Sequence, residues 1–173
     1  MRSASGNGTG GRDAAVTLRP GLPGDAPALA RIYLTARAAA LPGLREPWGE
    51  AAVAAWLRDT LLACHRVWVA VVAGSPVAYL GLAGTEILHL YVAPGFQGRG
   101  TGGRLLAEAM AAAPAGLTLY AFERNHAARR FYQRHGFRIA DRRAASANEE
   151  GEPDIRYVLA PRAMSDLTEE REP

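Results

Sequence analysis

A glycine-rich turn is the part of the sequence best suited to hold an anion. Residues 97–103 read Gln-Gly-Arg-Gly-Thr-Gly-Gly and lie between a β-rich run, Ile87–Val92, and a helical stretch that we expect over Gly100–Ala113. The first amides of a helix lack backbone partners, and the helix dipole adds positive charge there. Glycines let the backbone approach phosphate oxygens closely. Because Arg99 and Arg104 add full charges, we predict a phosphate-binding turn.

Two other phosphate-binding motifs fit this turn less well. A Walker-type loop ends in Gly-Lys-Ser/Thr, and the chain contains no lysine. The dinucleotide fingerprint G-x-G-x-x-G is met by Gly98, Gly100 and Gly103, and Glu123 follows 20 residues later. Residues 93–97 separate these glycines from the strand, however, and too little chain remains after Glu123 for the second half of a doubly wound sheet.

A third interpretation rests on two segments taken together. The pattern Q-x-x-G-x-G at residues 97–102, after a strand that ends Leu-Tyr-Val, resembles the acyl-CoA signature of the Gcn5-related N-acetyltransferase superfamily. The pattern N-x-x-A-x-x-F-Y-x-x-x-G-F at residues 125–137 is similar to that superfamily's second characteristic segment. The resemblance covers roughly Val16–Ala160. It implies a mixed sheet splayed between its fourth and fifth strands, with acetyl-CoA as co-substrate and without a metal.

The resemblance also implies a set of cofactor contacts. The fourth strand would hold the pantetheine arm, the amides of the turn would hold the pyrophosphate, and the asparagine that opens the second segment would contact pantetheine. The residues placed at the cofactor in this way are Leu90, Tyr91, Val92, Gln97, Gly98, Arg99, Gly100, Thr101, Gly102, Gly103, Arg104 and Asn125.

Two residues are candidates for proton transfer. The resemblance directs Tyr132 at the thioester sulfur, where a phenol can protonate the leaving thiolate; the alternative is a core tyrosine on a helix face. Glu86 lies 11 residues before Gln97, the position of the catalytic glutamate in the histone-acetylating branch. If Glu86 shares a strand face with Leu88 and Leu90, partial burial would raise its pKa. An exposed Glu86 with a water as the base is the other option, and we expect His89 to be a packed surface residue.

The resemblance places the acceptor pocket at two loops, Leu41–Trp48 and Ala144–Pro153. The second loop is acidic, and such a loop attracts a cationic amine; a solvated hairpin loop is the plainer interpretation. Trp48, with its neighbour Pro47, could wall an acceptor. The residues predicted to bind the acceptor are Trp48, Asn148, Glu149 and Glu150.

The surrounding elements predict an α/β fold in which a mixed sheet has helices on both faces. Asp25 is suited to cap the first helix, Trp56 has core spacing in the second, and residues 74–76 suit a hairpin turn. The expected strands and helices run, in order, over 16–19 (strand), 25–36 (helix), 49–61 (helix), 67–73, 77–83 and 87–92 (strands), 100–113 (helix), 117–122 (strand), 125–135 (helix), and 137–142 and 155–159 (strands).

Composition sets the limits of these interpretations. We expect one N-acetyltransferase domain over residues 15–160, between a disordered extension (1–14) and an acidic tail (161–173). The single Cys64 suits a reducing compartment, and no apolar run is long enough to span a membrane, so we expect a cytoplasmic protein. Seven arginines between Arg99 and Arg138 could bind nucleic acid or an anionic cofactor.

Together these observations predict transfer of an acetyl group from acetyl-CoA to a primary amine of a small molecule or peptide, by direct attack on the thioester. A non-catalytic module that binds CoA for regulation is the alternative from another class. We expect neither a nucleic acid nor a membrane as partner, and the resemblance leaves a homodimer open.

Overall fold

The computed structural model describes residues 15–145, 148 and 150–161 of the 173-residue chain. The predicted extension (1–14) and all but the first residue of the predicted tail (161–173) lie outside the described residues. No helix in the described ranges is long and apolar enough to cross a bilayer.

One seven-stranded sheet forms the centre of the fold, in the order β1-β2-β3-β4-β5-β7-β6. Neighbouring strands are antiparallel except β4 and β5, which run parallel. This arrangement confirms the predicted mixed sheet. The strands are β1 (Thr17–Pro20), β2 (Arg66–Val72), β3 (Ser75–Ala83), β4 (Glu86–Val92), β5 (Leu117–Phe122), β6 (Arg138–Arg143) and β7 (Asp154–Leu159).

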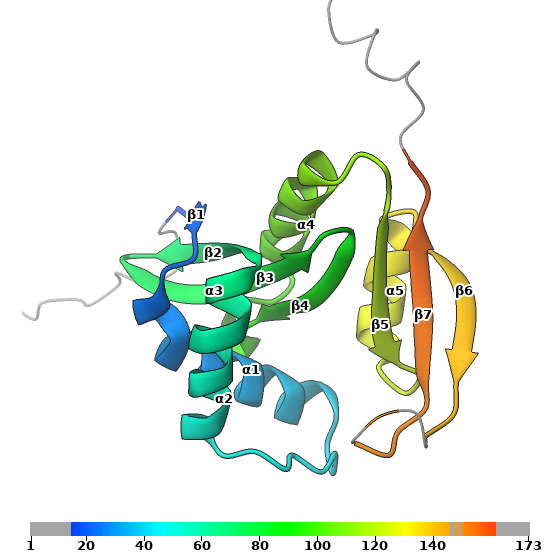
Figure 1. The fold of residues 1–173 in the computed structure, drawn as a ribbon, viewed down its shortest axis with the longest axis horizontal. Helices are drawn as coiled ribbons and strands as arrows, with labels where there is room; N and C mark the ends of the chain where they lie inside the picture. Colours follow the sequence, from blue (N-terminus) through cyan, green and yellow to red (C-terminus); the bar gives the residue numbers. More distant parts are fainter. Residues whose placement is uncertain (1–14, 146–147, 149, 162–173) are drawn as a thin grey trace, which may run out of the picture.

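Helices cover both faces of this sheet (Figure 1). On one face lie α1 (Ala26–Ala40), α2 (Glu50–Trp56), a π-helical stretch (Leu57–Leu61) and α3 (Leu62–Cys64). On the other face lie α4 (Thr101–Ala112) and α5 (His126–Arg134). Side chains alternate between the two resulting cores, so that Tyr79 of β3 packs with α1 and α2 while Leu80 packs with α4 and α5.

The sheet opens between β4 and β5. Only two residue pairs join these strands, Glu86 with Thr118 and Ile87 with Leu119. Further along, His89–Val92 pair with β3 on one side but have no partner in β5. Figure 1 shows β5, β7 and β6 turning away from β1–β4 beyond this point. The splayed sheet that the resemblance implied is therefore confirmed.

A β-bulge lies where the two strands part. In the β3–β4 ladder Leu82 faces Ile87 and Gly81 faces His89, so Leu88 is an extra residue in β4. A bulge bends its strand and changes which face the following side chains take. Leu88 consequently packs toward α1 and α2, whereas Leu90 packs toward α4 and α5. The expectation that Leu88 and Leu90 share a face with Glu86 is therefore wrong.

Two local predictions also need correction. The Asp25 carboxylate does not cap α1; it accepts a hydrogen bond from the Leu22 amide (2.8 Å) and two from Arg19 (2.7 and 2.8 Å). Asp25 thus closes the short 3₁₀ turn before α1, and the bonds from Arg19 lower the pKa of its carboxyl. The β2–β3 turn lies at Ala73 and Gly74, both with positive φ, because Ser75 already pairs with Val72.

Gly116 lies in the turn between α4 and β5, where its main chain packs closely against the end of β7. Its φ is +110°, and a Cβ there would lie 2.6 Å from the Leu159 carbonyl oxygen in β7. We therefore expect Gly116→Ala to lower the free energy of unfolding by about 1–3 kcal/mol, measured by urea denaturation. Gly95→Ala is the control, because no atom lies within 4 Å of its added Cβ; equal losses in the two variants would contradict the prediction.

Candidate active site

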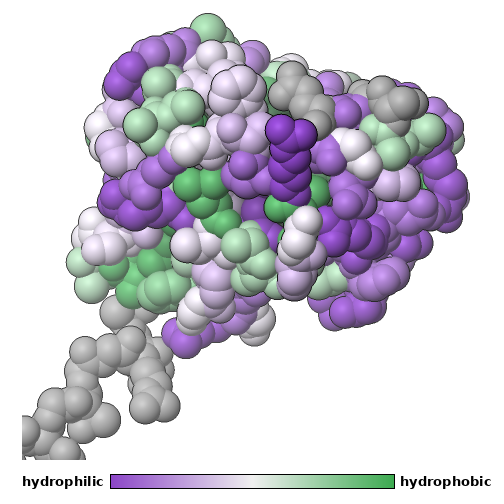
Figure 2. All heavy atoms as spheres, turned by 90° about the horizontal axis from the view of Figure 1, so that it is seen from below, coloured by the Kyte–Doolittle hydropathy of each residue, from purple (hydrophilic) through white to green (hydrophobic). Residues whose placement is uncertain are grey.

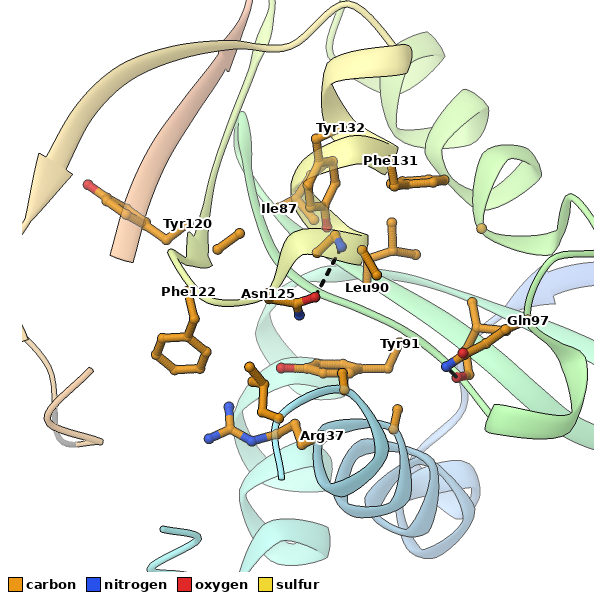
Figure 3. Close-up of a pocket in the computed structure, with 18 of the residues that line it drawn as sticks. Arg37, Ile87, Leu90, Tyr91, Gln97, Tyr120, Phe122, Asn125, Phe131 and Tyr132 are labelled. Carbon is orange, nitrogen blue, oxygen red and sulfur yellow. Dashed lines mark hydrogen bonds between the residues drawn. The ribbon is translucent and has the colours of Figure 1, made fainter. Parts of the chain in front are cut away.

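A cavity of about 1170 Å³ occupies the gap between β4 and β5. It runs from the glycine-rich turn at one end, past β4 and α5, to the last turns of α1 and the loop between β6 and β7 at the other. Figure 3 shows this order, with Gln97 at one end, Arg37 and Phe122 at the other, and Asn125 and Tyr132 between them. In Figure 2, which views the molecule from below, small hydrophobic areas lie among hydrophilic residues near the middle of the face.

The turn at the first end has the backbone that an anion site requires. Gly98 and Gly100 adopt positive φ of 72° and 79°, which glycine takes at little cost. Helix α4 begins at Thr101, and the Arg104 amide is the one that donates back to the Gly100 carbonyl. The amides before Arg104 thus precede the first helical hydrogen bond. The cavity is lined here by Gln97, Gly98, Gly100, Thr101, Gly102 and Gly103, all of which were predicted to bind the cofactor.

The two predicted arginines of this turn do not line the cavity. Arg99 lies over the Phe96 ring, 5.5 Å from its centroid. Arg104 reaches away toward β1, where its Nη1 donates to the Val16 carbonyl at 2.8 Å. The side chain of Gln97 has a structural role. Its Nε2 donates a hydrogen bond to the Val92 carbonyl at 3.0 Å, which fixes the turn to the end of β4.

Two residues that were not predicted line this end instead. Arg134 and His135, at the end of α5, border the cavity beside the start of α4. The His135 Nδ1 donates to the Phe131 carbonyl at 2.8 Å, and its Nε2 lies 3.3 Å from where a Cβ of Gly103 would be. Both residues fall within the second sequence segment. Their relation to the turn depends on how α5 packs on α4, which no local pattern shows.

The middle of the cavity holds Asn125 and Tyr132. Asn125 caps α5, because its Oδ1 accepts a hydrogen bond from the Ala128 amide at 3.0 Å (Figure 3). Tyr132 is buried among Phe131, Phe137 and Tyr157, yet it lines the cavity. Burial raises the pKa of its hydroxyl, with a smaller contribution from Tyr91. The phenol is therefore protonated at neutral pH and can donate a proton.

The fourth strand presents its main chain and one polar side chain. Leu90 and Val92 pack toward α4 and α5, whereas the Tyr91 ring lies on the α1 face and crosses Tyr33 edge-on at 5.0 Å. Burial raises the pKa of the Tyr91 hydroxyl, and the nearby Arg37 guanidinium opposes this rise. In Figure 3 that hydroxyl lies on the side of Arg37 and Phe122.

Only some of the residues predicted to bind the acceptor line the cavity. Asn148 and Glu150 line the cavity, but Asn148 mainly closes its own loop through bonds to the Glu152 backbone at 2.6 and 3.2 Å. Glu150 is paired with Arg37. Trp48 is 56% exposed and does not line the cavity. Glu149 lies outside the described residues.

The structure places Glu86 outside the cavity. Glu86 is partly exposed at the closed end of the opening, where β4 still pairs with β5. Its charge acts on Arg143, which is held by Asp154 through bonds of 2.7 and 2.6 Å. Among the described residues, the carboxylates that line the cavity are Glu150 and Asp154, and both have arginine partners.

His89 and Trp56 pack against each other on the α1 side of β4. His89 is half-buried and lies between the rings of Tyr33 (5.5 Å) and Trp56 (5.2 Å), both nearly parallel to it. The Tyr79 hydroxyl lies 2.9 Å from its Nδ1. Burial lowers the pKa of His89 to about 3, so its imidazole is neutral. Trp56, predicted to be core, is 43% exposed because it covers His89 from the solvent side.

Comparisons with known proteins agree with this geometry. A family model, the acetyltransferase (GNAT) domain, matches residues 63–139. A GCN5-related N-acetyltransferase from Rhodopseudomonas palustris has a TM-score of 0.69 and 26% identity, over 87% of this chain and 99% of that one. Residues 63–139 thus match the GNAT domain, and the described chain has the fold of GNAT acetyltransferases. No curated protein matches it significantly.

Two further N-acetyltransferase structures share the fold. The PaiA N-acetyltransferase from Thermoplasma acidophilum, solved with coenzyme A, has a TM-score of 0.65 and 17% identity, over 84% of this chain and 99% of that one. The ribosomal-protein-S18-alanine N-acetyltransferase from Escherichia coli has a TM-score of 0.66 and 22% identity, over 88% and 99%. The GNAT domain match and the Rhodopseudomonas neighbour indicate an acyl-CoA-dependent N-acyltransferase.

The GNAT match covers one half of the cavity. Residues 63–139 include β4, the glycine-rich turn, α4, β5 and α5, which form the glycine-rich end and the middle of the cavity. Helix α1 and the β6–β7 loop, which close the other end, lie outside the match. No cluster of three or more metal-ligating side chains occurs in the part of the GNAT domain that the structure describes.

His89 makes stability depend on pH. The unfolded histidine takes up a proton near pH 6.5, whereas the native one does not until about pH 3. The contribution of neutral His89 to the free energy of unfolding is fully present above pH 6.5. Below pH 6.5 this contribution falls by at most about 1.4 kcal/mol per pH unit. The stability advantage of the wild type over His89→Gln should therefore shrink between pH 6.5 and 5 in urea denaturation. An advantage that is constant over this range would show that native His89 takes up its proton over the same pH range as the unfolded residue, so that its pKa is not lowered.

Proposed function

We propose that the chain transfers an acetyl group from acetyl-CoA to a primary amine of a small molecule or peptide, by direct attack of the amine on the thioester. The observation that carries this proposal is that one cavity joins the amides of the glycine-rich turn, the unpaired edge of β4 and the Tyr132 hydroxyl. The coenzyme A complex of the Thermoplasma enzyme supports the donor, and the Escherichia coli enzyme's alanine acceptor supports an amine.

Acetyl-CoA suits the shape and chemistry of the cavity. Its pyrophosphate is an anion for the amides of Gly98–Gly103, where Arg134 and His135 add donors. Its pantetheine arm carries amides that can pair with the free main chain of Leu90–Val92. The Nδ2 group of Asn125 is available beside it, because the capping bond uses Oδ1. This order along the cavity brings the thioester next to Tyr132.

The chain's residues then meet two needs of the reaction. Main-chain amides of β4 near the bulge can stabilise the oxyanion, since they have no partner in β5. Tyr132 can donate its proton to the leaving thiolate, because its hydroxyl is protonated at neutral pH and lines the cavity. We assign deprotonation of the amine to water, because the carboxylates that line the cavity within the described residues are paired with arginines and Glu86 lies outside it.

The proposed function is tested by a screen for thiol release. Acetyl-CoA is incubated with the protein and with aliphatic amines, polyamines and short peptides that have free N-termini, while calorimetry measures CoA binding. Release of CoA that depends on the amine supports the proposal. Tight CoA binding without turnover of any amine would favour a regulatory module, and no binding at all would exclude both.

Tyr132→Phe should lower kcat about 100-fold while leaving the Kd for CoA nearly unchanged, because a positioned general acid contributes about 10²–10⁴-fold. Tyr157→Phe is the matched control, since Tyr157 is equally buried but does not line the cavity. Stopped-flow measurement of thiol release with the best amine compares the two variants. If Tyr132→Phe behaves like Tyr157→Phe, Tyr132 has only a packing role.

Glu86→Gln should leave the pH–rate profile of kcat/KM unchanged, with the rate within about 3-fold of the wild type. The reason is position: Glu86 lies at the closed end of the opening and does not line the cavity. The profile is measured from pH 6 to 10 with a single amine. Loss of its basic-side rise in the variant would identify Glu86 as the base, either directly or through a water.

A further inference from the structure

Arg37 occupies an unusual position for an arginine. It lies in the last turn of α1, is only 7% exposed, and lines the acceptor end of the cavity. Its guanidinium lies over the rings of Tyr33 (4.9 Å) and Phe122 (5.5 Å). A buried guanidinium needs partners that repay its lost hydration, and the residues that supply them should depend on it.

The two charged partners of Arg37 come from different loops. Its Nε lies 2.9 Å from Oε2 of Glu46, in the loop between α1 and α2. Its Nη2 donates to Oε1 of Glu150 at 3.0 Å, in the loop between β6 and β7. One side chain therefore connects two loops that are about 100 residues apart in sequence.

A second arginine repeats this connection nearer the solvent. Arg124 follows β5; its Nη1 donates to the Pro42 carbonyl of the first loop at 3.1 Å. Its Nη2 lies 3.0 Å from Oε1 of Glu152 in the second loop. The second loop is also braced internally, since Asn148 bonds the Glu152 backbone. Each loop is thus held against the opening between the half-sheets mainly through polar contacts.

We propose that Arg37 is a positioning residue for the acceptor: by holding Glu46 and Glu150 it fixes both loops as one wall, facing Tyr91 and Phe122. The proposal rests on the proposed acetyl transfer and deepens it, because it names what sets the acceptor site. Arg37 acts through the loops and takes no part in proton transfer. Its removal should therefore weaken acceptor binding and leave the phosphate end intact.

The test compares Arg37→Met, which keeps the aliphatic stem, with Arg37→Lys, which keeps the charge. Arg31→Met is the matched control, because Arg31 lies on the same helix and pairs with Glu50 on the exposed surface. Calorimetry gives the Kd for CoA. Hydrogen exchange follows the amides of residues 41–49 and 150–153. Thiol release gives KM and kcat with two acceptor probes, spermidine and the peptide amide Ala-Ala-Ala-NH₂.

For Arg37→Met we expect exchange at least 10-fold faster in both loops together, and an acceptor KM at least 10-fold higher. The Kd for CoA and kcat at saturating acceptor should change less than 3-fold. Arg37→Lys should recover part of the KM, and Arg31→Met should match the wild type. Faster exchange in one loop only, faster exchange throughout the domain, or an unchanged KM would each overturn the proposal.

Two additional results keep the test decisive. If Arg37→Met loses its cooperative thermal transition, Glu150→Gln removes one partner alone and must reproduce the rise in acceptor KM. If the wild type binds CoA but acetylates neither probe nor any amine of the screen, the proposed function fails. The exchange data then decide by themselves whether Arg37 holds the two loops, and unchanged exchange would refute that as well.

Discussion

The architecture of the site depends on the pairing between β4 and β5, which stops after two residue pairs. After Ile87 and Leu119 the parallel strands β4 and β5 separate, at the place where Leu88 forms a bulge in β4. A bulge bends and twists its strand, so the extra residue and the separation have a common geometric origin. The main chain of β4 beyond the bulge is left with free donors and acceptors. Such groups are costly to bury without partners, and an extended ligand with amide groups supplies them.

The backbone of the glycine-rich end of the cavity could be predicted because its signals are local. Gly98 and Gly100 adopt positive φ, and Asn125 caps its own helix, so each residue type is explained within a few residues of chain. The predicted strands and helices agree with the structure in order and type for the same reason: their hydrophobic periodicity reflects the face that each element buries.

The errors arise where tertiary packing overrides a local pattern. The bulge at Leu88 moves Leu90 to the other face of β4, so that strict alternation from Glu86 fails. Arg104 donates to the carbonyl of Val16, just before β1. Trp56 keeps helical spacing but covers His89, and is left half in solvent. One extra residue, or one partner from a distant strand, was enough to change each outcome, and the sequence contains neither signal.

The acceptor half shows a different limit of sequence reasoning. An acidic loop, considered from its sequence alone, is predicted to attract a cationic substrate. In the fold Glu150, Glu152 and Asp154 have arginine partners that come from α1, from the end of β5 and from β6. Their charge is therefore used to join segments, and little remains to attract a substrate from a distance. Since the GNAT match ends before this loop, acceptor choice in this chain should follow from the shape that these ion pairs hold more than from their net charge.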